Sequence, residues 1–147
     1  MVEIAPKISE LKDQAELFSV VSLFAGGGGS STGYRMAGGK THIASEFIET
    51  AADTYEANWK DATVYRCDIR DIKAKRFDIG AELDLLDGSP PCSAFSVAGS
   101  REKGWGKTKK YSDSAQDRVE DLFFEYVRIL SCLKPRTFIA ENVQGLV

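Results

Sequence analysis

Short apolar runs alternate along this chain with segments in which apolar positions recur at helical spacing. Short runs bounded by glycine, proline or acidic residues are typical of buried strands. The predicted strands are residues 19–24, 42–47, 63–67, 83–86 and 137–140. Strands that alternate with helices form βαβ units. The pattern therefore predicts an α/β fold with a doubly wound, mostly parallel sheet, in which ligands bind at the carboxyl ends of the strands.

Helical patterns fill two segments of the chain, and the polar arm of residues 1–18 is also expected to be helical. In residues 49–59, Thr50 and Asp53 have the spacing of a capping box. In residues 116–134, apolar side chains fall on one helical face, with a proline just beyond the end. This stripe predicts core packing and consists of Val119, Leu122, Phe123, Tyr126 and Leu130.

Composition limits the number of domains and the environment. A chain of 147 residues with 43% hydrophobic content can bury one sizeable core, so residues 19–147 are expected to form a single domain. No apolar run approaches the roughly 20 residues of a membrane span, and no signal-peptide pattern is present, so we expect a cytoplasmic protein. The three cysteines lack CxxC spacing, which predicts reduced thiols and no metal site. Cys67 and Cys132 are interpreted as packing residues on a strand and a helix.

Charge gives two opposite indications about nucleic acid. The net charge of -3 does not favour a domain that holds DNA alone, because Lys and Arg must neutralise phosphates. Basic residues nevertheless gather in residues 99–111, GSREKGWGKTKKY, among aromatic residues and glycines: Arg101, Lys103, Lys107, Lys109 and Lys110. On composition alone, this segment fits a solvated loop as well as a contact with DNA.

A glycine-rich turn, FAGGGGSSTG, follows the first predicted strand. Gly26, Gly28 and Gly29 let the backbone bend tightly and approach a ligand at a helix N-terminus. Ser31 takes the place of the third glycine of the dinucleotide fingerprint, so the turn alone also fits a purely structural role. Glu46 ends the second strand about twenty residues later, where an acidic side chain can accept both ribose hydroxyls. Together they predict a nucleoside cofactor, and no GxxxxGK[ST] motif calls for phosphates.

Chemically active side chains are predicted at the ends of the remaining strands. Asp68 ends the third strand, where it either reaches a nucleobase or is simply solvated. Cys92 follows two prolines on a rigid mount in GSPPCSAFS, although a lone cysteine is more often a small buried residue. Glu141 and Asn142 end the fifth strand beside the fourth, so a nucleophile and an acid would face one crevice. His42 begins a strand and is interpreted as core or surface filler.

These motifs, in this order, resemble the DNA cytosine-5 methyltransferase family. The resemblance runs from about Val20 to Val147 and rests on FAGGGG, Glu46, CDI, GSPPCSAFS, LFF and ENV. It implies a Rossmann-like, S-adenosylmethionine-dependent methyltransferase fold. It also implies that the Cys92 thiolate adds to carbon 6 of a cytosine flipped out of DNA, with Glu141 assisting at ring nitrogen 3. Asn142 would support the loop that bears Cys92.

The resemblance also implies which residues bind S-adenosylmethionine. They are the turn residues Phe24, Ala25, Gly26, Gly28 and Gly29, the ribose acceptor Glu46, the adenine neighbours Phe47, Asp68 and Ile69, and the methionine-end residues Pro91 and Leu122. The basic segment 99–111 falls where the mobile loop of the family closes on DNA. Ser93 stands where glutamine is common, so contacts near the flipped base are expected to differ.

Members of this family continue beyond the last motif found here. They carry an arginine-containing strand, a target-recognition domain and a late segment that packs on the cofactor. We therefore expect one sheet edge without cover, and a fragment or subunit that needs a complementary C-terminal polypeptide or an oligomeric partner. Two alternatives remain open at this point: a noncatalytic, truncated cofactor-binding domain, and a tRNA cytosine-5 methyltransferase with a similar core.

Overall fold

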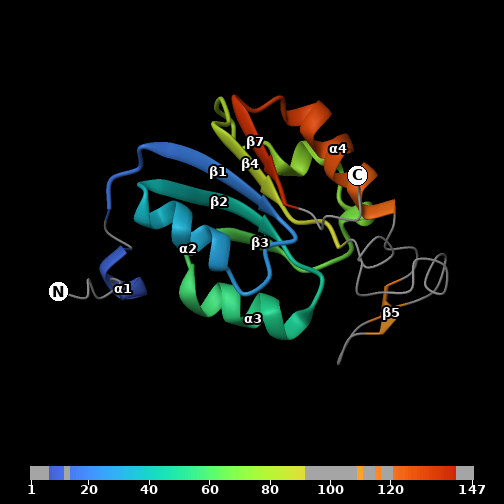
Figure 1. Cartoon of the computed structure of the whole chain (residues 1–147), viewed down its shortest axis with the longest axis horizontal. Coiled ribbons are helices and arrows are strands. Elements are labelled where there is room, and N and C mark those ends of the chain that lie inside the picture. Colours follow the sequence, from blue (N-terminus) through green and yellow to red (C-terminus); the bar gives the residue numbers. More distant parts are fainter. Residues whose placement is uncertain (1–6, 12–13, 92–108, 111–114, 117–120, 142–147) are drawn as a thin grey trace.

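A parallel sheet forms the centre of the molecule. The computed structural model describes residues 7–11, 14–91, 109–110, 115–116 and 121–141. The sheet has five strands in the order β3-β2-β1-β4-β7 (Figure 1). They are β1 Phe18–Leu23, β2 Gly39–Ser45, β3 Thr63–Tyr65, β4 Leu85–Gly88 and β7 Thr137–Ala140. All of the predicted strands are present, which confirms the α/β fold with a parallel sheet.

The strand order brings the carboxyl ends of the central strands together. β1 lies between β2 and β4, and Leu23 pairs with both Ser45 and Gly88. Residues 19–23 of β1 are buried, as expected for a parallel strand that is covered on both faces. The chain leaves β1 toward β2 and later returns to β4 on the opposite side of β1. In such sheets, this switch point opens a crevice at the carboxyl edge.

Helices cover both faces of the sheet, which confirms the doubly wound arrangement. Ile43 and Ala44 are consecutive on β2 but belong to separate apolar clusters, one on each face. One face carries α2 Gly29–Met36 and α3 Glu49–Asn58 (Figure 1). The other carries α4 Leu122–Leu133 and the 3-10 turns η1 Ile69–Asp71 and η2 Ala74–Phe77.

The helices differ in detail from the predictions. α3 begins at Glu49 after the N-cap Ile48, which has no side-chain cap, so the capping box of Thr50 and Asp53 is wrong. The carbonyl of Ile48 instead accepts from the backbone N–H groups of Ala51 and Ala52 at the helix entry. In the arm, the described helical part is only α1, Ile8–Leu11, whose last residue is 1% exposed and packs against α3.

The apolar stripe of α4 packs into the core as predicted. Leu122, Tyr126 and Ile129 are buried, while Phe123 and Leu130 are half-buried; Val119 lies outside the described residues. Ile129 was absent from the predicted stripe, although it follows Leu122 by seven positions and Tyr126 by three and so lies on the same helical face. Within the described ranges, no helix has the length and apolar character that crossing a membrane requires.

A buried carboxylate ties α2 to the two central strands. Asp87 on β4 is 7% exposed and pairs in register with Ser22 on β1. The Ser22 hydroxyl donates to Oδ2 at 3.0 Å, and the Tyr34 hydroxyl on α2 donates to Oδ1 at 2.9 Å. Burial raises the pKa of the Asp87 carboxyl, and the hydrogen bonds from Tyr34 and Ser22 only partly offset that rise. The helix that follows the glycine turn is thereby fixed to β4.

The last strand of the sheet is uncovered. β7 pairs with β4 on one edge, and no described strand pairs with its other edge. Phe138 is 56% exposed and Ile139 is 46% exposed. Because consecutive strand residues point to opposite faces, both faces of β7 are left partly open to solvent. This agrees with the expected sheet edge without cover. Outside the main sheet, β5 Lys109–Lys110 pairs with β6 Ala115–Gln116.

Candidate functional site

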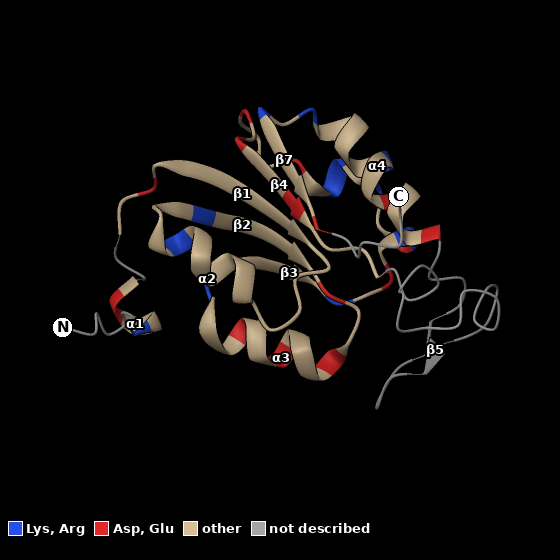
Figure 2. Cartoon of the chain, in the orientation of Figure 1, with Lys and Arg blue, Asp and Glu red and all other residues tan. Residues whose placement is uncertain are grey.

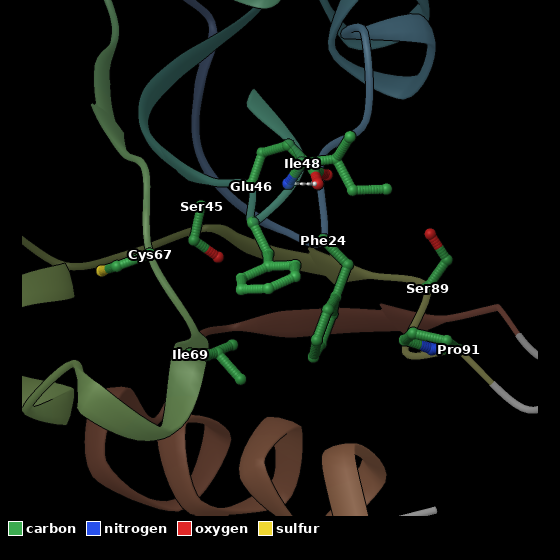
Figure 3. A pocket seen from close by; sticks show the side chains of 9 residues that line it. Phe24, Ser45, Glu46, Ile48, Cys67, Ile69, Ser89 and Pro91 are labelled. Carbon is green, nitrogen blue, oxygen red and sulfur yellow. Dashed lines mark hydrogen bonds between the residues drawn. The ribbon is translucent and has the colours of Figure 1, made fainter. Parts of the chain in front are cut away.

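A cavity of about 220 Å³ lies at the carboxyl edge of the sheet (Figure 3). Its wall comes from the segments that follow four strands in turn: Phe24 after β1, Ser45, Glu46, Phe47 and Ile48 at the end of β2, Cys67 and Ile69 after β3, and Ser89 and Pro91 after β4. The cavity therefore occupies the crevice that the strand order opens. Five of the predicted cofactor residues line it: Phe24, Glu46, Phe47, Ile69 and Pro91.

The glycine-rich turn has the backbone conformation that its sequence indicates. Gly26 and Gly28 have φ of 56° and 91°, in the region that favours glycine. Phe24 also has a positive φ, 56°, which costs a residue with a Cβ about 1–3 kcal/mol. The N–H of Ala25 donates to the carbonyl of Ser45 at 2.9 Å and so ties the turn to β2. Strain of this kind is typical of functional sites, where the surrounding structure enforces it.

Gly28 also lies against the side chains of α3 and its C-terminal end. A Cβ at this position would meet the Trp59 ring at 3.0 Å and the Tyr55 ring at 3.1 Å. Gly28 is the N-cap of α2, and its carbonyl accepts from the Thr32 backbone and hydroxyl, each at 2.9 Å. Both the backbone conformation and the close packing therefore require glycine here.

Glu46 links the turn to the start of α3 through both oxygens of its carboxylate. Oε2 accepts from the Gly26 N–H at 2.8 Å, and Oε1 accepts from the Ile48 N–H at 2.7 Å. The side chain is 9% exposed and lines the cavity. Each carboxylate oxygen can accept more than one hydrogen bond, so Glu46 can also receive the two hydroxyls of a ribose. This pair of acceptor oxygens thus fits the ribose of a nucleoside.

The remaining cavity wall is mostly apolar and fits a flat base. Its apolar lining residues are Phe24, Phe47, Ile48, Ile69 and Pro91. In Figure 3, Phe24 points toward Ile69, with Pro91 and Ser89 on one side and Cys67 on the other. Apolar and aromatic surfaces with a few placed polar groups are characteristic of small-molecule sites.

Asp68 lies beyond the strand rather than at its end, because β3 stops at Tyr65. It is the N-cap of η1 and accepts from the Arg70 backbone N–H at 3.0 Å. The Arg70 guanidinium also donates to Asp68, from Nε at 3.0 Å and Nη2 at 2.8 Å. Asp68 therefore stabilises the turn that carries Ile69 but does not itself line the cavity.

The two cysteines within the described ranges are not packing residues. Cys67 and Cys132 are both exposed. Cys67 follows the short strand β3 and lines the cavity, with its sulfur directed away from Phe24 in Figure 3. Cys132 lies on α4, away from its buried face. Burial raises the pKa of the Cys67 thiol, and the nearby carboxylates of Asp71 and Asp68 raise it further.

Glu141 lies at the same edge of the sheet as the cavity. Its N–H donates to the Gly88 carbonyl at 3.0 Å, which continues the pairing of β7 with β4, and its side chain is exposed. The buried Tyr126 joins these strands, since its hydroxyl donates to the Leu86 carbonyl at 3.3 Å and the Ile139 carbonyl at 3.0 Å. Glu141 therefore stands beside the strand end from which the chain runs through Pro91 toward position 92.

Several predicted site residues lie outside the cavity or outside the described residues. Leu122 is fully buried in the core, and Ala25, Gly26, Gly28 and Gly29 form the turn without lining the cavity. Outside the described residues are Cys92, Ser93, Arg101, Lys103, Lys107 and Asn142. Of Lys109 and Lys110 the structure describes the backbone, as β5. The lining residues that the sequence did not single out are Ser45, Ile48, Cys67 and Ser89; each lies within two positions of one that it did.

The described surface near the cavity is acidic on α3. Acidic residues recur along this helix (Figure 2), and Glu49, Asp53 and Glu56 all form ion pairs with Arg66. A face of this kind does not attract phosphates. Among the described residues, no group of three His, Cys, Asp or Glu side chains could hold a metal ion.

Known proteins similar to this chain are described as DNA methylases or methyltransferases. The family model of the C-5 cytosine-specific DNA methylases matches residues 18–147. Type II methyltransferase M.NgoPII of Neisseria gonorrhoeae is 35% identical over 128 residues, 87% of this chain and 34% of the relative. M.Sau96I of Staphylococcus aureus is 41% identical over 132 residues, 88% of this chain and 28% of the relative.

A shorter relative and a solved structure match the same region. Type II methyltransferase M.AquIA of Picosynechococcus is 32% identical over 133 residues, which are 87% of this chain and 49% of the relative. A solved E. coli structure, described as a DNA modification methyltransferase encoded within a prophage, has a TM-score of 0.67 and 25% identity. The match covers 88% of this chain and 33% of that structure. The chain thus spans about a third of the length of M.NgoPII and about half of M.AquIA.

Proposed function

Because the chain belongs to the family of C-5 cytosine-specific DNA methylases, we propose that it carries the cofactor site and the nucleophile of such an enzyme. The reaction is the transfer of a methyl group from S-adenosylmethionine to carbon 5 of cytosine in DNA. The observation that carries the proposal is the placement of Glu141. It lies at the same sheet edge as the nucleoside-sized cavity and beside the strand that leads to Cys92.

S-Adenosylmethionine would bind in the cavity and would supply an electrophilic methyl group on a sulfonium. Glu46 would hold the ribose hydroxyls, and Phe47 and Ile69 would lie against the adenine. Pro91 would line the methionine end, which points toward the nucleophile. The turn from Phe24 to Gly28 would support the cofactor with its backbone. The cavity lining supports the contacts of Phe24, Glu46, Phe47, Ile69 and Pro91, and the hydrogen bond from Gly26 to Glu46 places the turn next to the ribose acceptor.

The chain's own residues would activate the cytosine. The Cys92 thiolate would form a bond to carbon 6, and the electrons of the carbon 5–carbon 6 double bond would move into the ring. Glu141 would stabilise that charge by a hydrogen bond or proton at ring nitrogen 3. Carbon 5 could then take the methyl group, whose bond to the sulfonium would break to leave a neutral thioether. Loss of the carbon 5 proton to a base and departure of the Cys92 thiolate would restore the aromatic ring.

The test supplies the missing part of the enzyme and traps the covalent intermediate. The chain is mixed with the C-terminal two thirds of a relative, with S-adenosylmethionine and with DNA that contains 5-fluorocytosine, which after methyl transfer has no proton to lose at carbon 5. We expect a covalent protein–DNA adduct that disappears in Cys92→Ser and forms more slowly in Glu141→Gln. Cys67→Ser and Cys132→Ser are matched controls and should keep the adduct. An adduct that maps to Cys67 or Cys132 would show that the nucleophile is wrong.

A complementary polypeptide is part of this proposal. The relatives are longer than the chain, and the open edge and both faces of β7 offer apolar surface for further structure. The noncatalytic alternative differs in one measurable respect, since no added partner would then restore methyl transfer. Among the possible substrates, DNA is favoured over tRNA because the family model and the named relatives are DNA methylases and type II methyltransferases. Competition between DNA and tRNA in the restored reaction would decide between them.

A further inference from the structure

Arg128 connects α4 to the wall of the cavity, and the mechanism proposed above does not use it. Its Nη2 donates to the backbone carbonyls of Ile69 and Ile72, each at 3.0 Å. Its Nε donates to the Glu125 carboxylate at 2.7 Å. A single guanidinium therefore holds both ends of the turn that carries Ile69, one of the cavity-lining residues.

The anchor point of this contact is rigid. Arg128 lies between Tyr126 and Ile129, which are 1% and 0% exposed, so the helix backbone at this position is fixed against the sheet. Glu125, one turn earlier, orients the guanidinium. Hydrogen bonds from a charged donor are about twice as strong as neutral ones. The η1 turn is a short element with two backbone hydrogen bonds of its own, from the Asp71 N–H to the Asp68 carbonyl at 3.0 Å and from the Ile72 N–H to the Ile69 carbonyl at 3.2 Å.

We infer that Arg128 is a positioning residue for the cofactor base. Its hydrogen bonds to the carbonyls of Ile69 and Ile72 fix the position of the η1 turn relative to α4. They thereby fix the distance between the Ile69 side chain and a base bound against Phe47. Asp68 precedes the same turn and moves with it. The inference rests on the proposed function, because it takes the ligand of the cavity to be an adenosyl group.

This role predicts an effect on base recognition that differs from the effect of Glu46. A turn that shifts moves the apolar Ile69 side chain away from the base, while the ribose contacts at Glu46 stay in place. A ligand without the base has no contact with Ile69 to lose. Arg128 should therefore control the preference for a ligand with the base over one without it, and Glu46 should control affinity for both equally.

The experiment measures binding of S-adenosylhomocysteine and of S-ribosylhomocysteine, which lacks the base, to the full chain by ligand-observed NMR. In Arg128→Met we expect affinity for the adenine ligand to fall roughly tenfold, equivalent to about 1.4 kcal/mol, and the preference over the ligand without a base to fall by a similar factor. Arg128→Lys should restore part of the preference, because an ammonium can still donate to one carbonyl. Arg136→Met is the matched control, since Arg136 is 66% exposed and pairs with Asp84 far from the cavity.

The outcomes separate this inference from the proposed function. If no form of the chain binds either ligand, the adenosyl assignment of the cavity fails. If the wild-type chain binds and Arg128→Met keeps the same preference, the positioning role of Arg128 is refuted. A lower thermal stability of Arg128→Met with an unchanged preference also refutes it, because a merely structural contact would move only the stability. The positioning role is also refuted if the preference falls equally in Arg128→Met and in the control Arg136→Met.

Discussion

Replacing Glu46 by glutamine tests the two roles assigned to this carboxylate. The carboxylate accepts from the Gly26 N–H at 2.8 Å and the Ile48 N–H at 2.7 Å at a site that is 9% exposed. Glutamine keeps one acceptor oxygen and turns an NH₂ group toward the second N–H. One charge-assisted bond is then lost, and its nearly buried N–H is left unpaired. This single loss costs about 1–3 kcal/mol, so we expect the free energy of unfolding to fall by about 2 kcal/mol.

The same substitution should weaken binding of S-adenosylhomocysteine by at least roughly tenfold, because a ribose hydroxyl loses a charged acceptor. Urea unfolding gives the stability, and calorimetric titration gives the affinity. Glu56→Gln is the control, since that carboxylate is 44% exposed and its ion pair with Arg66 is worth under about 1 kcal/mol. If Glu46→Gln lowers the stability while the affinity is unchanged, Glu46 only stabilises the fold and its assignment to the ribose is wrong. If neither quantity changes, the hydrogen-bond geometry itself is contradicted.

Three further changes test the turn, the buried carboxylate and the open strand. Gly28→Ala should destabilise the chain by about 2 kcal/mol in urea unfolding, because φ is 91° and the new Cβ would lie 3.0 Å from Trp59; equal stability would contradict this packing. Burial raises the pKa of Asp87 above its ordinary 3.8, so its stabilising contribution is lost as pH rises from 3.8 through the raised value. Asp87→Asn should remove that part of the pH dependence of unfolding, and an unchanged dependence would refute the assignment. Phe138→Glu should leave stability within about 0.5 kcal/mol but prevent restoration of activity by a complementary polypeptide, whereas Leu17→Glu, at a site 77% exposed, should permit it.

The sequence predicts the strands well because parallel strands are buried on both faces and appear as continuous apolar runs. The residues at which the strands begin and end are harder to predict from the sequence. β2 begins at Gly39, three positions before the predicted start, and this glycine packs against the Phe18 ring, where a Cβ would be 2.5 Å away. β4 extends to Gly88, two positions beyond the predicted end, and the ring of Tyr126 occupies the space of the missing side chain. A glycine that makes room for a ring across the sheet cannot be told from a turn glycine in the sequence.

The site was predictable where one strand end supplies one residue, as with Glu46. The site was less predictable where the cavity wall depends on contacts between segments that are distant in the sequence. Cys67 was interpreted as a packing residue because a strand was expected to include it, but β3 ends at Tyr65 and leaves Cys67 on the cavity wall. Arg128 had no signal at all, since a charged residue within a helix is usually solvated. Its two carbonyl partners lie more than fifty residues earlier in the chain.

The uncovered β7 also has a consequence for dosage in a cell. A strand with a free edge and exposed apolar side chains on both faces can pair with the same strand of another molecule. Self-pairing depends on the square of the concentration, whereas pairing with a complementary polypeptide depends on the supply of both. We therefore expect that overproduction of this chain alone yields aggregated or degraded protein, and that matched synthesis with a complement restores its abundance. The ratio of the two polypeptides would then determine the amount of folded chain, and so the number of cofactor sites, in the cell.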